Sequence, residues 1–383
     1  MRHISLFAIV LALMAAACTP EAGFEARIET IDGVEWIHNP TSPQFPERSL
    51  TLEADLTLEG RDGDGNIILF RPSRFRVGLD DDFYVLDYED QTVKIFDRDG
   101  VYLRSFGGKG EGPGEFQNVI DMDILPDGRF IFLDTATRRT SLFDPQGIFL
   151  KSHQWRGFRM DILLPGEEYY IVDETVFMQP PHYTVKKIDL EGSEVLSFGE
   201  FTPLGIRIVR EGETTYSLVV PALPSSKFAS DPQRQRLYHC LNEQYLIEVF
   251  DAEGRLFRKI QRPYSPVPFT QEDADKFYAS HDRNADKMYG KLARQVELPR
   301  VKTVTDLMLV DDAGNLWIQT QENREEGDRV FTAYDIFDPD GSYAFRVWLS
   351  VAPSLIVGKK IYTLETDDEG YRTVKRYRMA WLD

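Results

Sequence analysis

The sequence predicts an all-β fold of six four-stranded antiparallel units. The first observation is a turn pattern, a hydrophobic residue followed by Asp-x-x-Gly, which recurs at Asp97, Asp144, Asp189, Asp251 and Asp338. The second is an apolar run some ten residues before each of these turns. The third is the period, because four strands in roughly 40 to 47 residues are typical of a propeller blade. We therefore expect a six-bladed β-propeller with one helical insertion between blades four and five.

The turns and the runs together define each unit as strand, turn, strand, loop, strand, turn, strand. In Asp-x-x-Gly, the Asp side chain accepts hydrogen bonds from backbone amides and the Gly adopts a left-handed conformation. The turns begin at Asp97, Asp144, Asp189, Asp251 and Asp338. The runs are residues 83–87, 130–134, 169–173, 237–241, 316–320 and 361–365. Inner strands are expected at residues 74–79, 119–125, 159–164, 304–310 and 354–358.

Residues 1–17 are typical of a lipoprotein signal peptide. Arg2 precedes an apolar stretch that is too short to span a bilayer, and small residues precede Cys18. This ending resembles the lipobox of bacterial lipoproteins, which implies that Cys18 is acylated and that residues 18–25 form a tether. We expect a lipoprotein of the bacterial cell envelope, in the outer membrane or facing the periplasm. Since Ala15 stands where Leu is usual, a secreted soluble protein is the alternative.

Residues 26–383 are expected to form the propeller. Its last unit lacks an obvious fourth strand, and residues 26–39 (ARIETIDGVEWIHN) can supply one. Pairing the start of the chain with its end would close the ring and leave no exposed edge. With Cys18 acylated, Cys240 has no disulfide partner, and its apolar surroundings in the sequence predict a buried thiol.

The stretch FGGKGEGPGEF, residues 106–116, has five glycines between two hydrophobic runs. A phosphate-binding loop would need a Gly-Lys-Ser/Thr ending and a following helix, and neither is present. We interpret the stretch as the crossing from the rim strand of one blade to the inner strand of the next, where glycine allows positive φ. Lys109, Glu111 and Glu115 would then lie on that face of the ring.

Residues 106–152 resemble an NHL repeat. They contain the glycine-rich GxGPGxF element, the Asp-Gly turn, the run that ends in Asp and the hydrophobic-Phe-Asp-x-x-Gly turn in the same order. The whole mature chain is similar to bacterial lipoproteins known only as six-bladed β-propellers. The resemblance implies the propeller fold and places Arg138 and Arg139 at the polar position between the second and third strands.

The long insertions are expected on one face of the ring. Residues 201–233 lie between blades three and four, and residues 268–299 lie between blades four and five. Long ordered insertions on a rigid scaffold are the usual place for binding. The candidate binding face comprises Lys109, Glu111, Glu115, Arg138, Arg139, Tyr216, Phe277 and Tyr278.

The insertion at 268–299 is predicted to be helical. Thr270 can cap its start with Asp273 reciprocating, and Pro299 stops it. The sequence leaves two arrangements open, a helix packed on the rim and a lid over the central channel.

Four carboxylates on expected inner strands form a candidate cation site, namely Asp121, Asp123, Asp161 and Asp306. They could bind Ca²⁺ at the channel mouth, as in propeller lactonases and lyases, or accept hydrogen bonds from neighbouring backbone, which we favour. Residues 61–66 (RDGDGN) hint at a calcium loop, but its twelfth position is Ser73 rather than Glu. No cofactor is expected, and which metal such a site would hold is unknown.

Two functional classes follow from these patterns. The first is a lipid-anchored, monomeric, non-catalytic propeller that recognises a protein, peptide or glycan through its inserted face. The second is a metal-dependent hydrolase or lyase of the lactonase or amidating-lyase kind. We favour the first and assign no catalytic residue. The formal net charge of −19 makes nucleic acid and anionic membrane surfaces poor partners.

Overall fold

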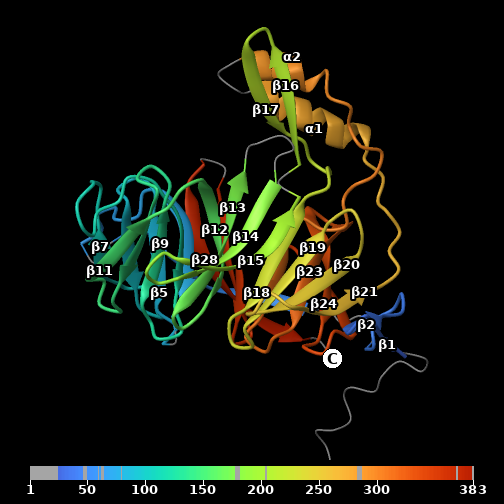
Figure 1. Ribbon diagram of the computed structural model, residues 1–383, viewed down its shortest axis with the longest axis horizontal. Coiled ribbons are helices and arrows are strands. Elements are labelled where there is room, and N and C mark those ends of the chain that lie inside the picture. The colour runs from blue at the N-terminus through green and yellow to red at the C-terminus, as the bar shows by residue number, and fades with distance from the viewer. Residues whose placement is uncertain are drawn as a thin grey trace, which may run out of the picture.

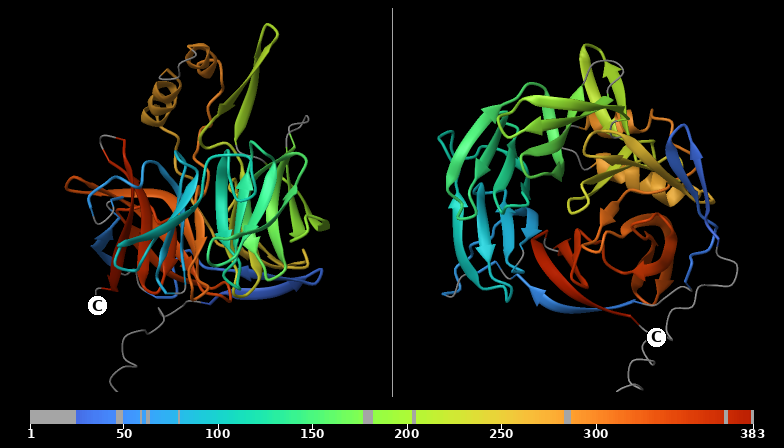
Figure 2. Two further views of the ribbon diagram at one scale, coloured as in Figure 1. Left: turned by 90° about the vertical axis from the view of Figure 1, so that its left-hand side faces the viewer. Right: turned by 60° about the horizontal axis from the view of Figure 1, so that its bottom comes forward.

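The computed structural model describes residues 25–45, 50–58, 60–61, 64–78, 80–176, 182–202, 205–282, 287–367 and 370–381. The expected signal peptide and Cys18 lie outside these residues. The described chain forms a six-bladed β-propeller, whose sheets surround a common axis (Figures 1 and 2). Neither of the helices in this part of the chain has the length and hydropathy of a membrane span.

Each blade is a four-stranded antiparallel sheet. Blade one is β4 (Pro72–Val77), β5 (Phe83–Asp87), β6 (Thr92–Phe96) and β7 (Tyr102–Gly107). Blade two is β8 (Val119–Ile124), β9 (Phe130–Asp134), β10 (Arg139–Phe143) and β11 (Phe149–Gln154). Blade three is β12 (Phe158–Pro165), β13 (Tyr169–Val176), β14 (His182–Asp189) and β15 (Glu194–Phe201).

The remaining blades follow the same order. Blade four is β18 (Ser226–Asp231), β19 (Arg236–Leu241), β20 (Leu246–Asp251) and β21 (Leu256–Gln261). Blade five is β22 (Met308–Val310), β23 (Leu316–Glu326), β24 (Arg329–Phe337) and β25 (Tyr343–Leu349). Blade six is β26 (Leu355–Val357), β27 (Lys360–Thr366), β28 (Arg372–Trp381) and β3 (Leu50–Thr57).

The Asp-x-x-Gly turns form as the sequence predicts. Asp97 Oδ1 accepts hydrogen bonds from the amides of Asp99 at 3.0 Å and Val101 at 2.8 Å, and Gly100 has a φ of 82°. The turns at Asp144, Asp189, Asp251 and Asp338 have the same pair of hydrogen bonds. Each turn therefore joins the third strand of its blade to the outer strand.

A second repeated Asp fastens the crossing between blades. Asp134 ends β9 and is fully buried. Its carboxylate accepts hydrogen bonds from the amides of Gln117 at 2.8 Å and Asn118 at 3.2 Å, just before the inner strand of the same blade. Asp87 does the same for the amide of Arg71 at 3.0 Å. In blades one and two, the Asp at the end of the second strand therefore fixes where the inner strand begins.

The ring closes differently from the sequence prediction. β3 pairs with β28 and completes blade six, so a strand from the start of the chain does close the ring. However, residues 26–39 do not supply it, and that expectation is wrong. They form the hairpin of β1 (Arg27–Ile31) and β2 (Val34–His38), and β2 pairs in parallel with β21 at the rim of blade four. Ile37 is buried in the core shared by blades four and five, which explains this choice.

The glycine-rich loop crosses from blade one to blade two, as predicted. Phe116 is fully buried, with its ring centroid 4.9 Å from that of Phe132 and 5.4 Å from that of Phe143. A Cβ on Gly107 would lie 2.7 Å from the Phe116 ring, and Gly107 has a φ of 81°. Glycine is therefore required here by both contact and conformation.

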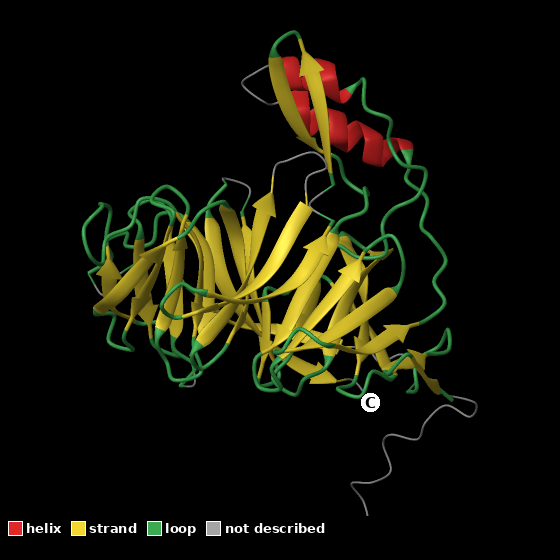
Figure 3. Ribbon diagram, in the orientation of Figure 1, coloured by secondary structure: helices red, strands yellow, loops and turns green. Residues whose placement is uncertain are grey.

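The two long insertions pack together above one face of the propeller. We call their ordered elements the cap: the hairpin of β16 (Ile206–Glu211) and β17 (Thr214–Val219), and helices α1 (Gln271–Asp282) and α2 (Met288–Ala293). Figure 3 shows the helices beside this hairpin, above the strands of the ring. The helical insertion between blades four and five is thus present. The first insertion is shorter than residues 201–233, because Ser226–Asp231 form β18, the inner strand of blade four.

The cap has a hydrophobic core of its own. This core contains the buried residues Leu218, Val220, Phe277, Leu292 and Ala293. The capping box forms at the start of α1, where the Thr270 amide donates to Asp273 Oδ2 at 2.9 Å and the Asp273 amide donates to Thr270 Oγ1 at 3.3 Å. The cap is therefore a small folded unit joined to the ring by its connecting segments.

Candidate functional site

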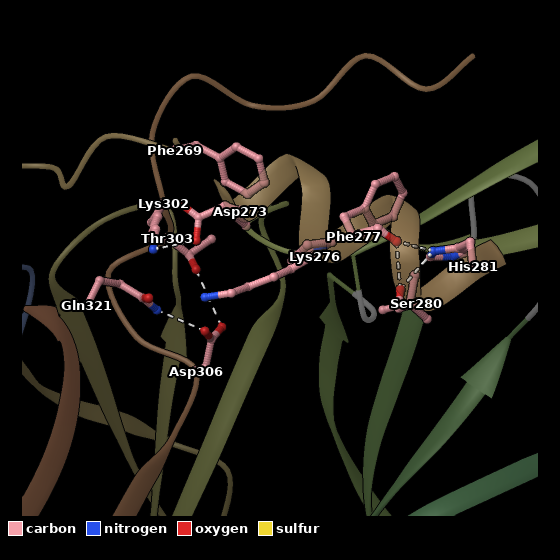
Figure 4. Close-up of a pocket in the computed structure, with 13 residues that line it drawn as sticks. Phe269, Asp273, Lys276, Phe277, Ser280, His281, Lys302, Thr303, Asp306 and Gln321 are labelled. Carbon is pink, nitrogen blue, oxygen red and sulfur yellow. Dashed lines mark hydrogen bonds and ion pairs between the residues drawn. The ribbon is translucent and has the colours of Figure 1, made fainter. Parts of the chain in front are cut away.

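A cavity of about 350 Å³ lies between the cap and blade five (Figure 4). The cap and its connecting segments contribute Val219, Pro221, Ala222, Phe269, Asp273, Lys276, Phe277, Ser280 and His281. The segment that enters blade five, and the blade itself, contribute Lys302, Thr303, Asp306 and Gln321. Cavities of about 300–1,000 Å³ with apolar walls and a few polar groups are typical of ligand sites.

Part of the cavity wall is apolar. Phe269 and Phe277 come from the segment that enters and forms α1, and Val219, Pro221 and Ala222 come from the end of the β16–β17 hairpin. Val219 is 56% exposed, although it is a large aliphatic side chain. Ala222 has a φ of 62°, which a residue with a Cβ rarely adopts. The strained backbone and the exposed valine both lie at this cavity.

The Asp273 carboxylate joins the cap to the segment that enters blade five. Lys302 Nζ lies 2.8 Å from Asp273 Oδ1. Burial alone would raise the pKa of Asp273, but hydrogen bonds from Lys302 and Thr270 hold this pKa below its usual value. Asp273 therefore stays ionised, and its ion pair with Lys302 holds the start of α1 against the segment that enters blade five.

Asp306 lies at the propeller side of the cavity. Its carboxylate accepts hydrogen bonds from Gln321 Nε2 at 2.8 Å and from Thr303 Oγ1 at 3.4 Å. The side chain is 58% exposed, and Lys227 Nζ on the inner strand of blade four is 4.0 Å away. Asp306 thus has a fixed orientation and an open carboxylate surface.

His281 lies at the cap side of the cavity. Its Nδ1 lies 2.9 Å from the carbonyl oxygen of Phe277 and 3.1 Å from Ser280 Oγ. Because a carbonyl oxygen can only accept, Nδ1 carries the hydrogen in this contact.

Three of the four carboxylates of the expected cation site come together, but around two arginines from blade one. Arg74 Nε lies 3.3 Å from Asp121, and Arg74 Nη2 lies 3.7 Å from Asp161. Arg76 Nε lies 3.0 Å from Asp123. Burial raises the pKa of Asp121 to about 6, against the lowering effect of Arg76.

These contacts do not fit a bound cation. Guanidinium groups fill the position between the carboxylates that a Ca²⁺ ion would take, and the Ile162 amide donates to Asp121 at 2.8 Å. Asp306 belongs to the cavity under the cap instead. Among the described residues, no group of three or more His, Cys, Asp or Glu side chains is arranged to hold a metal ion.

The polar residues of the predicted binding face hold the glycine-rich loop. Arg139 donates to the carbonyl oxygens of Glu111 at 3.2 Å and Glu115 at 2.6 Å. Lys109 forms a backbone bridge with Phe116, and Arg138 has a φ of 50° in the turn before β10. None of these residues is among those that line the cavity.

The aromatic residues of that predicted face build the cap. Tyr216 packs edge-on against Tyr289, with ring centroids 5.5 Å apart. Tyr278 lies against Phe277, with centroids 5.4 Å apart. Phe277 is 4% exposed, so it is buried rather than a surface aromatic as the sequence suggested, and it also borders the cavity.

Sequence reasoning missed Lys276, His281, Lys302 and Gln321. Lys276 and His281 lie in the predicted helical insertion, but the helical spacing could not show which face of the helix is turned toward the ring. Lys302 and Gln321 lie 19 positions apart in the sequence numbering and meet only because both reach the mouth of blade five. Single polar residues that are brought together only by the fold form no sequence motif.

The fold and the site define a six-bladed β-propeller with an inserted cap. Residues 69–184 match the family model DUF5128, described as a 6-bladed beta-propeller. No curated protein matches the sequence.

Solved structures resemble the chain at low sequence identity. A member of the duf4221 family from Bacteroides vulgatus is 10% identical with a TM-score of 0.55, and the match covers 88% of this chain and 100% of that one. A Bacteroides fragilis protein for which export has been suggested is 9% identical with a TM-score of 0.48, covering 90% and 99% of the two chains. Virginiamycin B lyase from Staphylococcus aureus is 12% identical with a TM-score of 0.39, covering 86% and 88%. The likeness to the duf4221 protein concerns the fold alone.

Proposed function

We propose that the protein is a lipid-anchored, non-catalytic binding propeller of the bacterial cell envelope, and that its ligand binds between the cap and blade five. The observation that carries this proposal is the cavity of about 350 Å³ between a separately folded cap and the ring. Its combination of apolar walls and oriented polar groups is that of a recognition site.

The way the cap is attached supports a binding role. The amide of Val220 donates to the Gly205 carbonyl oxygen at 2.8 Å, and the amide of Phe269 donates to the Arg300 carbonyl oxygen at 3.0 Å. Each insertion therefore leaves and re-enters the ring at nearly one point. A cap built in this way can shift relative to the ring while both keep their cores, which lets a ligand enter.

The channel carboxylates support binding over metal-dependent catalysis. Asp121, Asp123 and Asp161 have arginine partners at 3.0–3.7 Å, so the positive charges of Arg74 and Arg76 already compensate their negative charges. Ion pairs of this kind hold neighbouring blades together.

The position of the N-terminal hairpin supports an orientation relative to the membrane. β1 lies at the end of the propeller opposite the cap (Figures 1 and 2). A lipid on Cys18 would lie nine residues before Arg27, the first residue of β1, and nine residues span at most about 32 Å when fully extended. The anchored protein would then present the cap away from the membrane.

A cap deletion tests the proposal. Residues 206–219 and 270–299 are each replaced by a short linker, because the flanking residues are hydrogen-bonded to each other. Immobilised wild-type and cap-deleted proteins are incubated with an envelope extract, and bound material is identified by mass spectrometry. We expect the deleted protein to melt cooperatively and to lose the ligand that the wild type retains. Equal retention by a folded, cap-deleted protein would refute a site under the cap.

A further inference from the structure

The two lysines that line the cavity differ in how firmly they are paired. Lys302 and Asp273 lie 2.8 Å apart and both side chains are 20% exposed, so their charges compensate each other. Lys276 lies 2.7 Å from Glu272, but these side chains are 71% and 75% exposed. Exposed pairs of this kind contribute little and exchange readily with other partners. The Lys276 ammonium is therefore available to a ligand.

Asp306 is the complementary charge on the propeller side. Hydrogen bonds from Gln321 and Thr303 orient its carboxylate, and Lys227 Nζ lies 4.0 Å from it. Figure 4 shows the Lys276 side chain extending from α1 toward the side of the cavity on which Asp306 lies. The cavity thus combines a movable cation on the cap with an oriented anion on the ring.

An apolar wall adjoins these charges. Val219, Phe269 and Phe277 border the same cavity. Burying an aliphatic or aromatic group against them removes their surfaces from water, which is favourable. At about 350 Å³ the cavity is at the small end of the range of ligand sites.

We propose that the cavity binds a small zwitterion with an apolar side chain, a free amino acid or a short peptide, with its ammonium on Asp306 and its carboxylate on Lys276. This inference rests on the proposed function and names the ligand class of the same site. A ligand with only negative charge would meet the carboxylates of Asp306 and Asp273, and one with only positive charge would meet Lys276. An uncharged sugar would offer no opposite charge to either Lys276 or Asp306.

The zwitterion would hold the cap against the ring. Lys276 belongs to the cap and Asp306 to the propeller, so one ligand with both charges spans the two bodies. Binding would therefore close the cap, and removing either ligand charge would weaken both the contact and the closure.

Isothermal titration calorimetry on the mature chain tests the proposal with defined probes. The probes are phenylalanine and the dipeptide Leu-Phe, each also in an N-acetylated form and a C-terminally amidated form. We expect at least one free zwitterion to bind, and each capped form to bind at least tenfold more weakly. The comparison of the amino acid with the dipeptide distinguishes the two sources of this chemistry.

Two substitutions assign the charges. Asp306→Asn is expected to abolish the preference for the free amino group and keep the preference for the free carboxylate. Lys276→Met is expected to do the reverse. Matched controls are Asp312→Asn, in the exposed turn at the opposite end of blade five, and Lys287→Met, exposed before α2. Thermal melting of each variant checks that it is folded.

Two outcomes would overturn the ligand class. The first is equal affinity for free and capped probes, and the second is that none of the free zwitterions binds while the wild type still retains an extract ligand through its cap. In the second case the binding function stands and only the ligand class fails. If the cap deletion retains the extract ligand as well, the proposed function itself fails.

Discussion

Asn39 and Tyr343 are joined by a buried hydrogen bond, in which the Tyr343 amide donates to Asn39 Oδ1 at 2.8 Å. Asn39 Nδ2 also donates to the carbonyl oxygen of Gly341 at 2.9 Å. These bonds link the segment after the β1–β2 hairpin to the Asp-x-x-Gly turn of blade five. The start of the chain therefore fastens blades four and five as well as closing the ring at blade six.

Replacing Asn39 with Ala should lower the free energy of unfolding by about 1–3 kcal/mol, because it leaves a buried amide and a buried carbonyl without partners. Chemical denaturation monitored by tryptophan fluorescence measures this loss. Arg27→Ala, whose side chain is 68% exposed, is the control and should change little. An unchanged unfolding midpoint for Asn39→Ala would show that the segment is only a tether.

Two N-terminal deletions separate the hairpin from the closing strand. Removal of residues 25–39 should leave a monomeric, cooperatively melting ring of reduced stability, since β3 still pairs with β28. Removal of residues 25–57 exposes the edge of β28 and should cause aggregation. Size-exclusion chromatography distinguishes these results. If both deletions behave alike, β3 does not close the ring.

Replacing Asp134 with Ala should destabilise the propeller strongly. The carboxylate accepts hydrogen bonds from four backbone amides, those of Gln117, Asn118, Ala136 and Thr137. A loss of about 3 kcal/mol or more is expected, because hydrogen bonds to charged groups contribute about 1.5–3 kcal/mol each. Asp134→Asn keeps one acceptor and should lose less, and the exposed Asp99→Ala should lose almost nothing. Equal losses at positions 134 and 99 would contradict this account.

Glu248 should make the stability depend on pH in the acid range. The hydrogen bond with His239 lowers the pKa of Glu248 to about 2, with Lys259 adding to the effect against burial. The folded pKa lies below the unfolded value of 4.5, so its stabilising contribution is present above pH 4.5 and is lost as pH falls toward 2. The difference in melting temperature between wild type and Glu248→Gln should shrink over that window. A constant difference from pH 6 to pH 2.5 would contradict the assignment.

The anchor is tested by replacing Cys18 with Ala. Without the acylated cysteine, the product should stay unprocessed or leave the membrane fraction, and its mass should lack the lipid. Membrane fractionation and intact-mass measurement report both. Wild-type fractionation and mass in this variant would exclude lipidation at this position.

Sequence reasoning reached the blade architecture because each blade repeats local signals. Asp97 and Gly100 specify their turn within four residues, and Thr270 and Asp273 specify the start of α1 in the same way. Local signals could not show which N-terminal segment pairs with the last blade. Residues 26–39 and 50–57 are both compatible with an outer strand, and only the burial of Ile37 between blades four and five decides which goes where.

The candidate site was beyond local patterns for a similar reason. The insertions were placed on one face from topology, and the cap lies there. The charged groups of the cavity come from α1 and from blade five. They lie close together only because of the position of the cap relative to the ring. Asp306 was selected with the channel carboxylates, but its structural neighbours are Gln321 and Thr303. Arg74 and Arg76 alternate along the neighbouring inner strand, but no local pattern in the sequence marks them as partners of Asp121, Asp123 and Asp161.

Hydrogen–deuterium exchange tests most directly the central claim that the ligand binds between the cap and blade five. The mature protein is compared with and without the ligand fraction eluted from it after incubation with envelope extract. The account predicts slower exchange in peptides covering residues 219–222, 269–281 and 302–306, and no change in the Asp-x-x-Gly turns at the opposite end of the ring. Protection confined to those turns or to the rim strands, with the cap unchanged, would contradict it.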